Sequence, residues 1–253
     1  MRLLELDRYF RGLMSIDEMS RVDNSLNGIQ VGQPDMEIQK AAFAVDACLE
    51  SFERATDAGA NMIFVHHGMF WGSDRRVTGS HYRRIAHLIE NRCALYAVHL
   101  PLDSHPEFGN NARMASALGL TDIEPFGEYH GVKIGVKGTL SPAQGIDDIL
   151  DRLNLDRGAC GAVLPFGKKS NASVGIVSGG ATREVEQAID EGLDLYLTGE
   201  ASHNLYHLCL EEKINLISGG HYQTEVWGGS SLSERFEQDT GLSSVYIDVP
   251  TGL

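Results

Sequence analysis

NMIFVHH, residues 61–67, is an apolar run that leads directly into two histidines. Its length and its Ile, Phe and Val content predict a buried β-strand. Helical segments over 49–57 and 81–91 lie on either side of it, and apolar runs at 41–45 and 93–100 predict two neighbouring strands. This β-α-β-α-β order is typical of a largely parallel sheet covered by helices.

The second half of the chain repeats the alternation of strands and helices. Strands are predicted at 172–180, 193–200, 214–221 and 246–250, and helices at 182–191, 201–212 and 224–239. Between the halves lies a segment with a Gly-rich strand, a helix that starts near Ser141 and Pro142, and another strand. The sequence therefore predicts two similar α/β lobes with largely parallel sheets, over about 1–124 and 171–253, and a linking subregion over about 125–170.

A weak internal repeat accompanies these two lobes. A single offset places four residues of the first half on four identical residues of the second: Glu53, Ala55, Asp57 and Gly59 on Glu186, Ala188, Asp190 and Gly192. Duplication would explain the match, and so would the helix–Gly–strand pattern that any α/β unit shares. The sequence leaves both explanations open.

The composition excludes several classes of protein. With 21 Lys and Arg against 35 Asp and Glu, the net charge is −14. Such a surface has no basic stripe to displace counterions from phosphates, so no sequence-independent binding to nucleic acid is expected. A small anionic substrate stays compatible with this charge, because bound metal ions reverse the field locally.

The cysteines and the apolar runs indicate where the protein works. The cysteines lie far apart and form no C-x-x-C pair, which argues against a zinc ribbon or a disulfide scaffold and fits a reducing compartment; they are Cys48, Cys93, Cys160 and Cys209. The N-terminal residues show no apolar signal region, and no run reaches the roughly 18 apolar residues of a membrane span. We therefore expect a cytoplasmic protein with no membrane partner.

Three of the predicted strands end in residue types that bind metals: His66 and His67, then Asp103 after the strand that contains His99, and last His221 with Glu225. In open α/β sheets, functional groups gather beyond the carboxyl ends of the strands, so we expect these side chains to converge. Imidazole and carboxylate ligands suit Zn, Fe, Mn, Co or Ni. The sequence predicts two divalent metal ions per subunit, held by His66, His67, Asp103, His221 and Glu225.

Each of these residues also has an ordinary structural interpretation. A histidine pair at a strand end is often only structural or exposed. Asp103 follows Pro101 and would suit a turn or a helix cap. Glu225 would suit the first turn of a helix, where the helix dipole favours a carboxylate. The combination at three strand ends favours the metal site.

Glu200, His203 and His207 form a second pattern, E-x-x-H-x-x-x-H. It lacks the H-E-x-x-H order of zinc proteases, and His203 is expected on an exposed helix face. Glu200 and His207 are better interpreted as groups behind the ligands or facing the substrate. With His99 they are the catalytic candidates, as proton shuttles. GGATRE, residues 179–184, suits a plain turn better than an anion site.

Five segments carry a resemblance to a known family: DNSLNGIQVG (23–32), HHGMFWG (66–72), HLPLDSHPEFGNN (99–111), TGEASHNLYH (198–207) and GGHYQTE (219–225). They resemble the GTP cyclohydrolase I type 2 homologue family, also called the Nif-three-like family, and its bacterial YbgI-type members most. The resemblance implies a Nif-three-like fold, a two-metal centre with the same five ligands, and a ring-shaped homohexamer. One departure is Gly68, where many relatives have proline.

Two functions are compatible with these expectations. The first is a metal-dependent hydrolase that acts on a nucleotide-like small molecule, with GTP cyclohydrolase as the label that the resemblance implies. The second is a non-catalytic, metal-binding scaffold or metallochaperone that binds a partner protein. No catalytic residue in the sequence separates the two.

Overall fold

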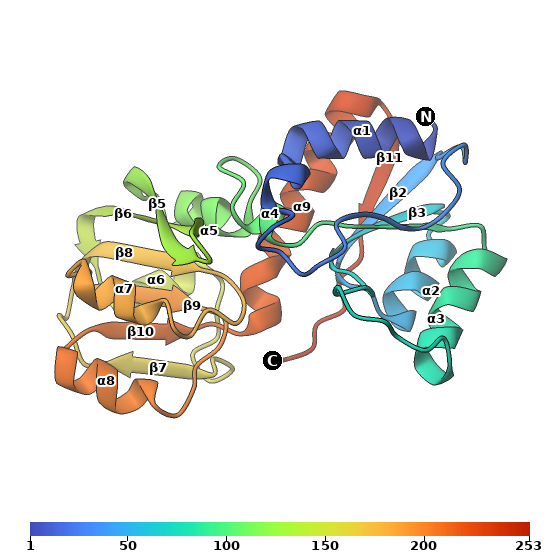
Figure 1. Ribbon diagram of the computed structural model, residues 1–253. Helices are drawn as coiled ribbons and strands as arrows, with labels where there is room; N and C mark the ends of the chain where they lie inside the picture. Colours follow the sequence, from blue (N-terminus) through green and yellow to red (C-terminus); the bar gives the residue numbers. More distant parts are fainter. The chain divides into compact units, whose positions relative to one another are not determined.

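The computed structural model describes residues 1–253, which form two compact units. Unit 1 comprises Met1–Leu102 and Gly228–Val249, and unit 2 comprises Asp103–Trp227 and Pro250–Leu253 (Figure 1). Unit 2 is therefore inserted into the sequence of unit 1. The units do not coincide with the two halves described above.

Unit 1 contains a five-stranded sheet with the order β1-β4-β3-β2-β11. Its strands are β1 (Gly28–Val31), β2 (Lys40–Asp46), β3 (Met62–His67), β4 (Ala94–Ala97) and β11 (Ser243–Tyr246). β11, β2, β3 and β4 run parallel, and β1 pairs antiparallel with β4. The central strands β2, β3 and β4 confirm the three apolar runs. The last strand was predicted too late, because its first residues, Ser243 and Ser244, give no apolar signal.

Helices cover both faces of this sheet. They are α1 (Leu3–Met14), α2 (Leu49–Asp57), α3 (Gly79–Glu90) and most of α9 (His221–Thr240), with the short η1 (Ile16–Met19) and α4 (Leu100–Asp103) beside them. Figure 1 shows α1 and α9 on one side of the strands and α2 and α3 on the other. Both units contribute to α4 and α9, because the boundaries fall within these two helices.

Alternation along the strands explains how both faces are filled. Phe43, Phe64 and Tyr96 point to one face, where their rings pack with Phe10 of α1 and Phe236 of α9 at centroid distances of 4.9–5.9 Å. Their neighbours point to the opposite face and join the core under α2 and α3, together with Phe52 and Leu88. Successive side chains in a strand face opposite ways, so a strand buried on both faces is apolar throughout.

Unit 2 contains a six-stranded sheet with the order β5-β6-β8-β9-β10-β7. Its strands are β5 (Thr121–Tyr129), β6 (Val132–Gln144), β7 (Ala162–Pro165), β8 (Asn171–Val177), β9 (Leu195–Thr198) and β10 (Asn215–Ser218). β8, β9 and β10 are parallel and confirm three predicted strands, whereas the other pairings are antiparallel. The sheet of unit 2 is thus mixed.

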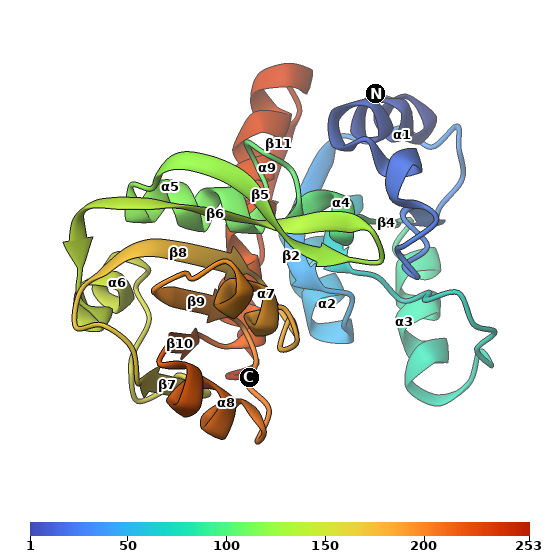
Figure 2. The ribbon, with the colours of Figure 1, turned by 60° about the vertical axis from the view of Figure 1, so that its left-hand side comes forward.

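The helices of unit 2 are α5 (Asn110–Leu118), α6 (Ile146–Arg152), α7 (Val185–Asp190) and α8 (Leu205–Glu212). Side chains of α5 and α6 pack in one core with strands β8, β9 and β10. Figure 2 shows α7 and α8 on the other side of the sheet from α6. The helix predicted near Ser141 and Pro142 was wrong, because β6 continues through both residues and α6 begins only after Gly145.

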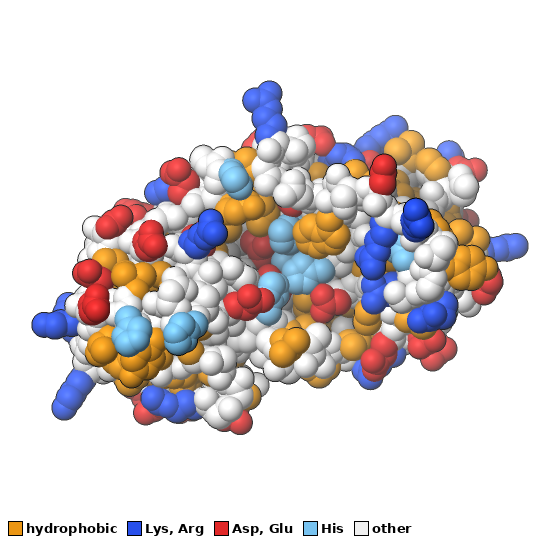
Figure 3. All heavy atoms as spheres, turned by 60° about the horizontal axis from the view of Figure 1, so that its bottom comes forward, with side chains coloured by type: hydrophobic (Ala, Val, Ile, Leu, Met, Phe, Trp, Pro, Cys, Tyr) orange, Lys and Arg blue, Asp and Glu red, His pale blue; other side chains and the backbone are white.

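No helix of the structure combines the length and the apolar character that crossing a membrane requires. On the face shown in Figure 3, acidic and basic side chains are mixed, and Lys and Arg form no continuous stripe across it.

Asp194 ties the sheet of unit 2 together and allows a first prediction. Its side chain accepts hydrogen bonds from the backbone N–H groups of Ala172 (2.8 Å) and Ser173 (3.2 Å), and it pairs with Lys168 at 2.6 Å. Burial raises the pKa of the Asp194 carboxyl, but Lys168 and the two backbone groups together lower it further, so the net shift is downward. Lys168 is 74 % exposed, so the ion pair itself contributes little.

We expect Asp194→Asn to lower the free energy of unfolding by about 1–3 kcal/mol at pH 7, because two partly buried hydrogen bonds lose a charged acceptor. A carboxyl with a lowered folded-state pKa stabilises the fold above its unfolded pKa, about 3.9. That stabilisation disappears as the pH falls through the folded-state value. Urea unfolding between pH 7 and about pH 2 measures both effects, because the folded-state pKa lies below the unfolded value. Asp190→Asn, at an exposed position, is the control and should change little.

Candidate functional site

Three histidines of unit 1 form a group at the carboxyl ends of its strands. His66 and His67 end β3, and His99 follows β4. The ring centroids lie 4.6 Å apart for His66 and His67, 5.1 Å for His66 and His99, and 5.8 Å for His67 and His99. One nitrogen of each ring lies within 4.8 Å of one nitrogen of the other two. The two adjacent histidines therefore lie together although both belong to a strand.

Hydrogen bonds fix the tautomer of all three rings. The acceptors of the Nδ1 atoms are the Val98 carbonyl for His66 (3.1 Å), Asp46 for His67 (2.9 Å) and Asp23 for His99 (2.9 Å). A carbonyl or carboxylate oxygen only accepts, so each Nδ1 must carry the hydrogen. In the neutral ring, Nε2 is then the nitrogen with a lone pair. Histidines that bind metals commonly donate from their other nitrogen in this way.

Asp23 is the most enclosed of these acceptors, with a side chain that is 1 % exposed. Besides His99, it accepts from the backbone N–H groups of Ser25 (2.9 Å) and Leu100 (3.0 Å) and from the Asn27 amide (2.8 Å). Burial raises the pKa of the Asp23 carboxyl, but the hydrogen bonds of His99, Asn27 and Ser25 outweigh burial and lower it. Asp23 is thus held as a carboxylate behind the His99 ring.

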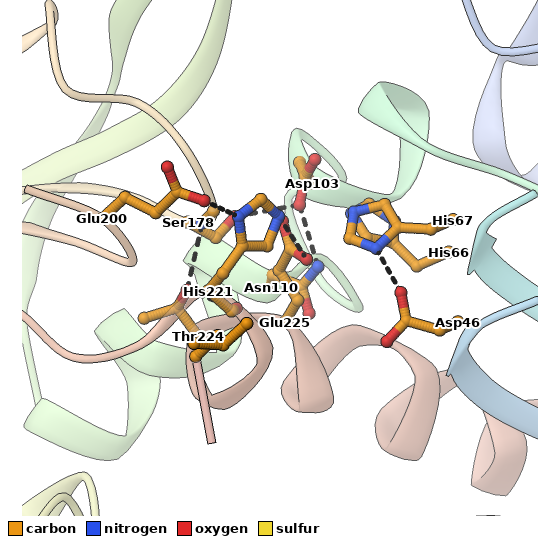
Figure 4. A network of polar contacts seen from close by, with 12 residues as sticks. Asp46, His66, His67, Asp103, Asn110, Ser178, Glu200, His221, Thr224 and Glu225 are labelled. Atoms are coloured by element: carbon orange, nitrogen blue, oxygen red, sulfur yellow. Dashed lines mark hydrogen bonds and ion pairs between the residues drawn. The ribbon is translucent and has the colours of Figure 1, made fainter. Parts of the chain in front are cut away.

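Unit 2 holds a second group, made of Asp103, Glu200, His221 and Glu225 (Figure 4). His221 and Glu225 lie one turn apart at the start of α9, with His221 Nε2 3.3 Å from a Glu225 oxygen. A carboxylate oxygen of Asp103 lies within 4.8 Å of one of Glu225. His221 Nδ1 donates to Glu200 at 2.6 Å. The spacing of residues 221 and 225 places both side chains on one helix face, as predicted.

The second group contains two carboxylates that are buried close together. Asp103 is 6 % exposed and Glu225 3 % exposed. Two carboxylates this close and this buried repel each other unless a cation compensates them. The pKa of His221 is raised to about 9, chiefly by its hydrogen bond to Glu225 and further by Glu200. Burial acts in the opposite direction and lowers it. Buried carboxylates with an imidazole are a donor set that fits a divalent cation.

Neutral groups orient the buried carboxylate of Asp103. Its Oδ1 accepts from the Asn110 side chain at 2.8 Å and from the Ser178 hydroxyl at 2.9 Å (Figure 4). Ser178 follows β8, and Asn110 begins α5. Donors of this kind fix the direction of a carboxylate's remaining lone pairs.

The Glu225 carboxylate occupies the space in which a side chain of residue 179 would lie, so glycine is required there. The φ of Gly179 is +66°, and a Cβ added there would lie 2.3 Å from Glu225 Oε1. Its N–H donates to the Thr224 hydroxyl at 3.0 Å. Residues 179–184 therefore form a tight turn packed on α9, in agreement with the plain-turn interpretation.

A comparison with known proteins identifies the family. The model of the Duf34/NIF3 (NGG1p interacting factor 3) family matches residues 1–251. The chain belongs to the Duf34/NIF3 family. A Treponema pallidum protein named GTP cyclohydrolase 1 type 2 homolog is 39 % identical, over 98 % of this chain and 99 % of that one. An Archaeoglobus fulgidus protein of the same name is 41 % identical over the whole of both chains.

The fold of this Duf34/NIF3 protein has a solved counterpart. The structure of protein ybgI, described as of unknown function, matches it with a TM-score of 0.91 and 29 % identity, over 100 % of both chains. The resemblance stated from the five sequence segments is thereby confirmed, and so is the mixed α/β fold with two sheets.

Not every predicted residue of this family member lies with the two groups. His207 is exposed on α8, where its ring contacts Tyr206, and it makes no hydrogen bond with Glu200 or His221. His203 is exposed, as expected, but it lies in a turn before α8 rather than on a helix face. Nδ1 of His105 accepts from the backbone N–H groups of residues 107 and 108, which is the geometry of a turn.

Sequence reasoning missed the residues that orient the histidines and Asp103, namely Asp23, Asp46, Asn110 and Ser178. For Asp46 a signal existed, because it is the last residue of β2 and pairs in register with His67. The contacts of the other three depend on tertiary structure, although Asp23 and Asn110 lie in two of the segments that carry the family resemblance.

Proposed function

We propose that this Duf34/NIF3 protein is a divalent-metal-dependent hydrolase of nucleotide-like small molecules. The observation that carries the proposal is the buried pair Asp103 and Glu225, beside His221, in one unit and the histidine group in the other. We propose that two ions are held by the five residues predicted from the sequence: His66, His67, Asp103, His221 and Glu225. Zn, Fe, Mn, Co and Ni all suit these donors.

Bound divalent ions would supply an activated water at neutral pH and would stabilise negative charge on the substrate. The chain's own residues would then handle the protons. His99 is our candidate for the shuttle, because its Nε2 carries a lone pair and can take a proton. Asp23 holds its Nδ1–H and would stabilise the imidazolium that forms. Glu200 would act differently, by holding Nδ1–H of His221 so that Nε2 keeps its direction.

The substrate class rests on the relatives. The T. pallidum and A. fulgidus proteins carry the name GTP cyclohydrolase 1 type 2 homolog, which refers to a nucleotide. We extend only the general class, a nucleotide-like small molecule, to this chain. The homohexamer and the cytoplasmic location stay predictions, and light scattering on the purified protein would measure the first.

The test is turnover by protein reloaded with each of Mn, Fe, Zn, Co and Ni, with GTP, other nucleotides and phosphodiesters as substrates. We expect activity with at least one metal, its loss in chelator, and its loss in His221→Ala. His203→Ala, an exposed histidine of the same unit, should remain active. Stable metal binding without turnover of any substrate would reject the hydrolase and favour the metal-binding scaffold.

A further inference from the structure

A strongly basic stretch follows β3 and reaches the last turn of α3. Residues 71–89 contain Arg75, Arg76, Arg83 and Arg84 but only one acidic residue, Asp74. In a chain with 35 acidic and 21 basic residues, such a stretch needs an explanation. None of the four guanidinium groups forms an ion pair, whereas several other arginines do: Arg11, Arg54, Arg157 and Arg235. Lys and Arg side chains gather toward the right of Figure 3, the side on which Figure 1 shows α3.

His81 provides the second observation. It lies in the first turn of α3 and is 2 % exposed, yet neither ring nitrogen has a hydrogen-bond partner. The buried Nε of Arg84 has none either. Burial lowers the pKa of His81, and the positive charges of Arg75 and Arg84 lower it further. Buried donors without partners are rare in folded proteins, and here they lie where positive charge is concentrated.

The start of α3 adds further donors at the same place. The helix has 12 residues, no side chain caps its first turn, and no acidic residue lies there. The first N–H groups of a helix lack intrahelical partners, and the helix dipole makes this end positive. An anion can accept from these N–H groups and from His81 and Arg84 together.

Two consecutive aromatic residues connect this stretch with the histidine group of the same unit. The Phe70 ring contacts His81 at a centroid distance of 5.5 Å. The Trp71 ring contacts His99 at 4.9 Å and His67 at 6.1 Å. Consecutive Cα atoms lie about 3.8 Å apart, so these ring contacts start from adjacent points of the backbone. Trp71 is 38 % exposed and offers a ring face of the kind on which nucleobases stack.

We propose that Arg75, Arg84, His81 and the first turn of α3 form an anion site that binds the phosphate groups of a nucleotide-like substrate. The substrate assignment rests on the proposed function, whereas the binding of phosphate does not. The site would hold the charged end of the ligand while its reacting part lies at the histidine group.

Calorimetric titration of the full chain with inorganic triphosphate tests the site, both in the protein as purified and after dialysis against EDTA. We expect binding in both. Arg75→Gln/Arg84→Gln should weaken it by at least about 10-fold, because charge-assisted hydrogen bonds to phosphate are lost. GTP should lose affinity in parallel, and guanosine should not. Arg75→Gln alone changes an exposed residue and should weaken binding in the same direction without disturbing the fold.

The charge-matched control is Arg8→Gln/Arg21→Gln, which removes two exposed arginines of unit 1 that form no ion pair. It should change the affinity by less than about twofold, since distant exposed charges are screened. Equal losses in both double variants, or loss of triphosphate binding after EDTA, would overturn the site. If triphosphate binds as expected but no substrate is turned over, the hydrolase fails and the anion site stands.

Discussion

Glu225→Gln should lose at least one metal ion per chain and nearly all turnover. The side chain is 3 % exposed, lies 3.3 Å from His221 Nε2, and has an oxygen within 4.8 Å of Asp103. The amide keeps the shape of the side chain but removes the negative charge that compensates a cation. Loss of groups that merely orient ligands costs about 10–100-fold in affinity, so loss of a ligand should cost more.

Elemental analysis of the gel-filtered protein, after reloading with metal, measures this loss. Glu234→Gln is the matched control, because it makes the same change at an exposed position of the same helix. It should retain the metal content of the unaltered protein. Asp103→Ala should behave like Glu225→Gln. Full occupancy of two sites in both ligand variants would contradict the assignment.

Asp23→Asn should lower kcat by about 10–100-fold while the metal content and KM stay unchanged. The carboxylate accepts the Nδ1–H of His99 at 2.9 Å and is nearly inaccessible to solvent. An amide does not supply the charge that stabilises a protonated imidazole, so a shuttle based on His99 would slow. His99 is not among the five proposed ligands, which is why metal binding should survive.

Asp194→Asn serves as the control for this variant as well. It also removes a buried carboxylate that accepts backbone N–H groups, but in unit 2 and with no histidine among its hydrogen-bond partners. Both variants should lose stability, and only Asp23→Asn should lose kcat. If the two behave alike in turnover, His99 has no role in moving protons. If Asp23→Asn releases metal, His99 is itself a ligand.

Strands in the middle of each sheet could be predicted from the sequence, whereas the edge strands β1 and β5 were missed. β3 and β9 are apolar on both faces, and a glycine-ended helix precedes each of them. β1 and β5 lie at edges. β5 contains Pro125 and Gly127 and is mostly exposed, so it shows neither an apolar run nor clean alternation. Proline is tolerated there because an edge strand does not need every N–H.

The same distinction applies to the candidate site. Residues at strand ends, such as His66, His67 and His221, could be selected because topology brings strand ends together. Asp23, which accepts the hydrogen bond of His99, could not be selected in this way. It lies in a turn that is far from His99 in the chain. The contact depends on how the segment that contains Asp23 folds back, and a single sequence carries no signal for such long-range partners.

Because unit 2 is inserted into unit 1, the order of synthesis becomes a constraint on folding. The ribosome completes β2, β3 and β4 early, but α9 and β11, which cover one face and one edge of that sheet, come only after Asp103–Trp227. At typical elongation rates this delay is on the order of 10 s. During that time Phe10 and Phe43 have no Phe236 ring to pack against. We therefore expect the nascent chain to be prone to aggregation, and we expect chaperones to bind its first hundred residues.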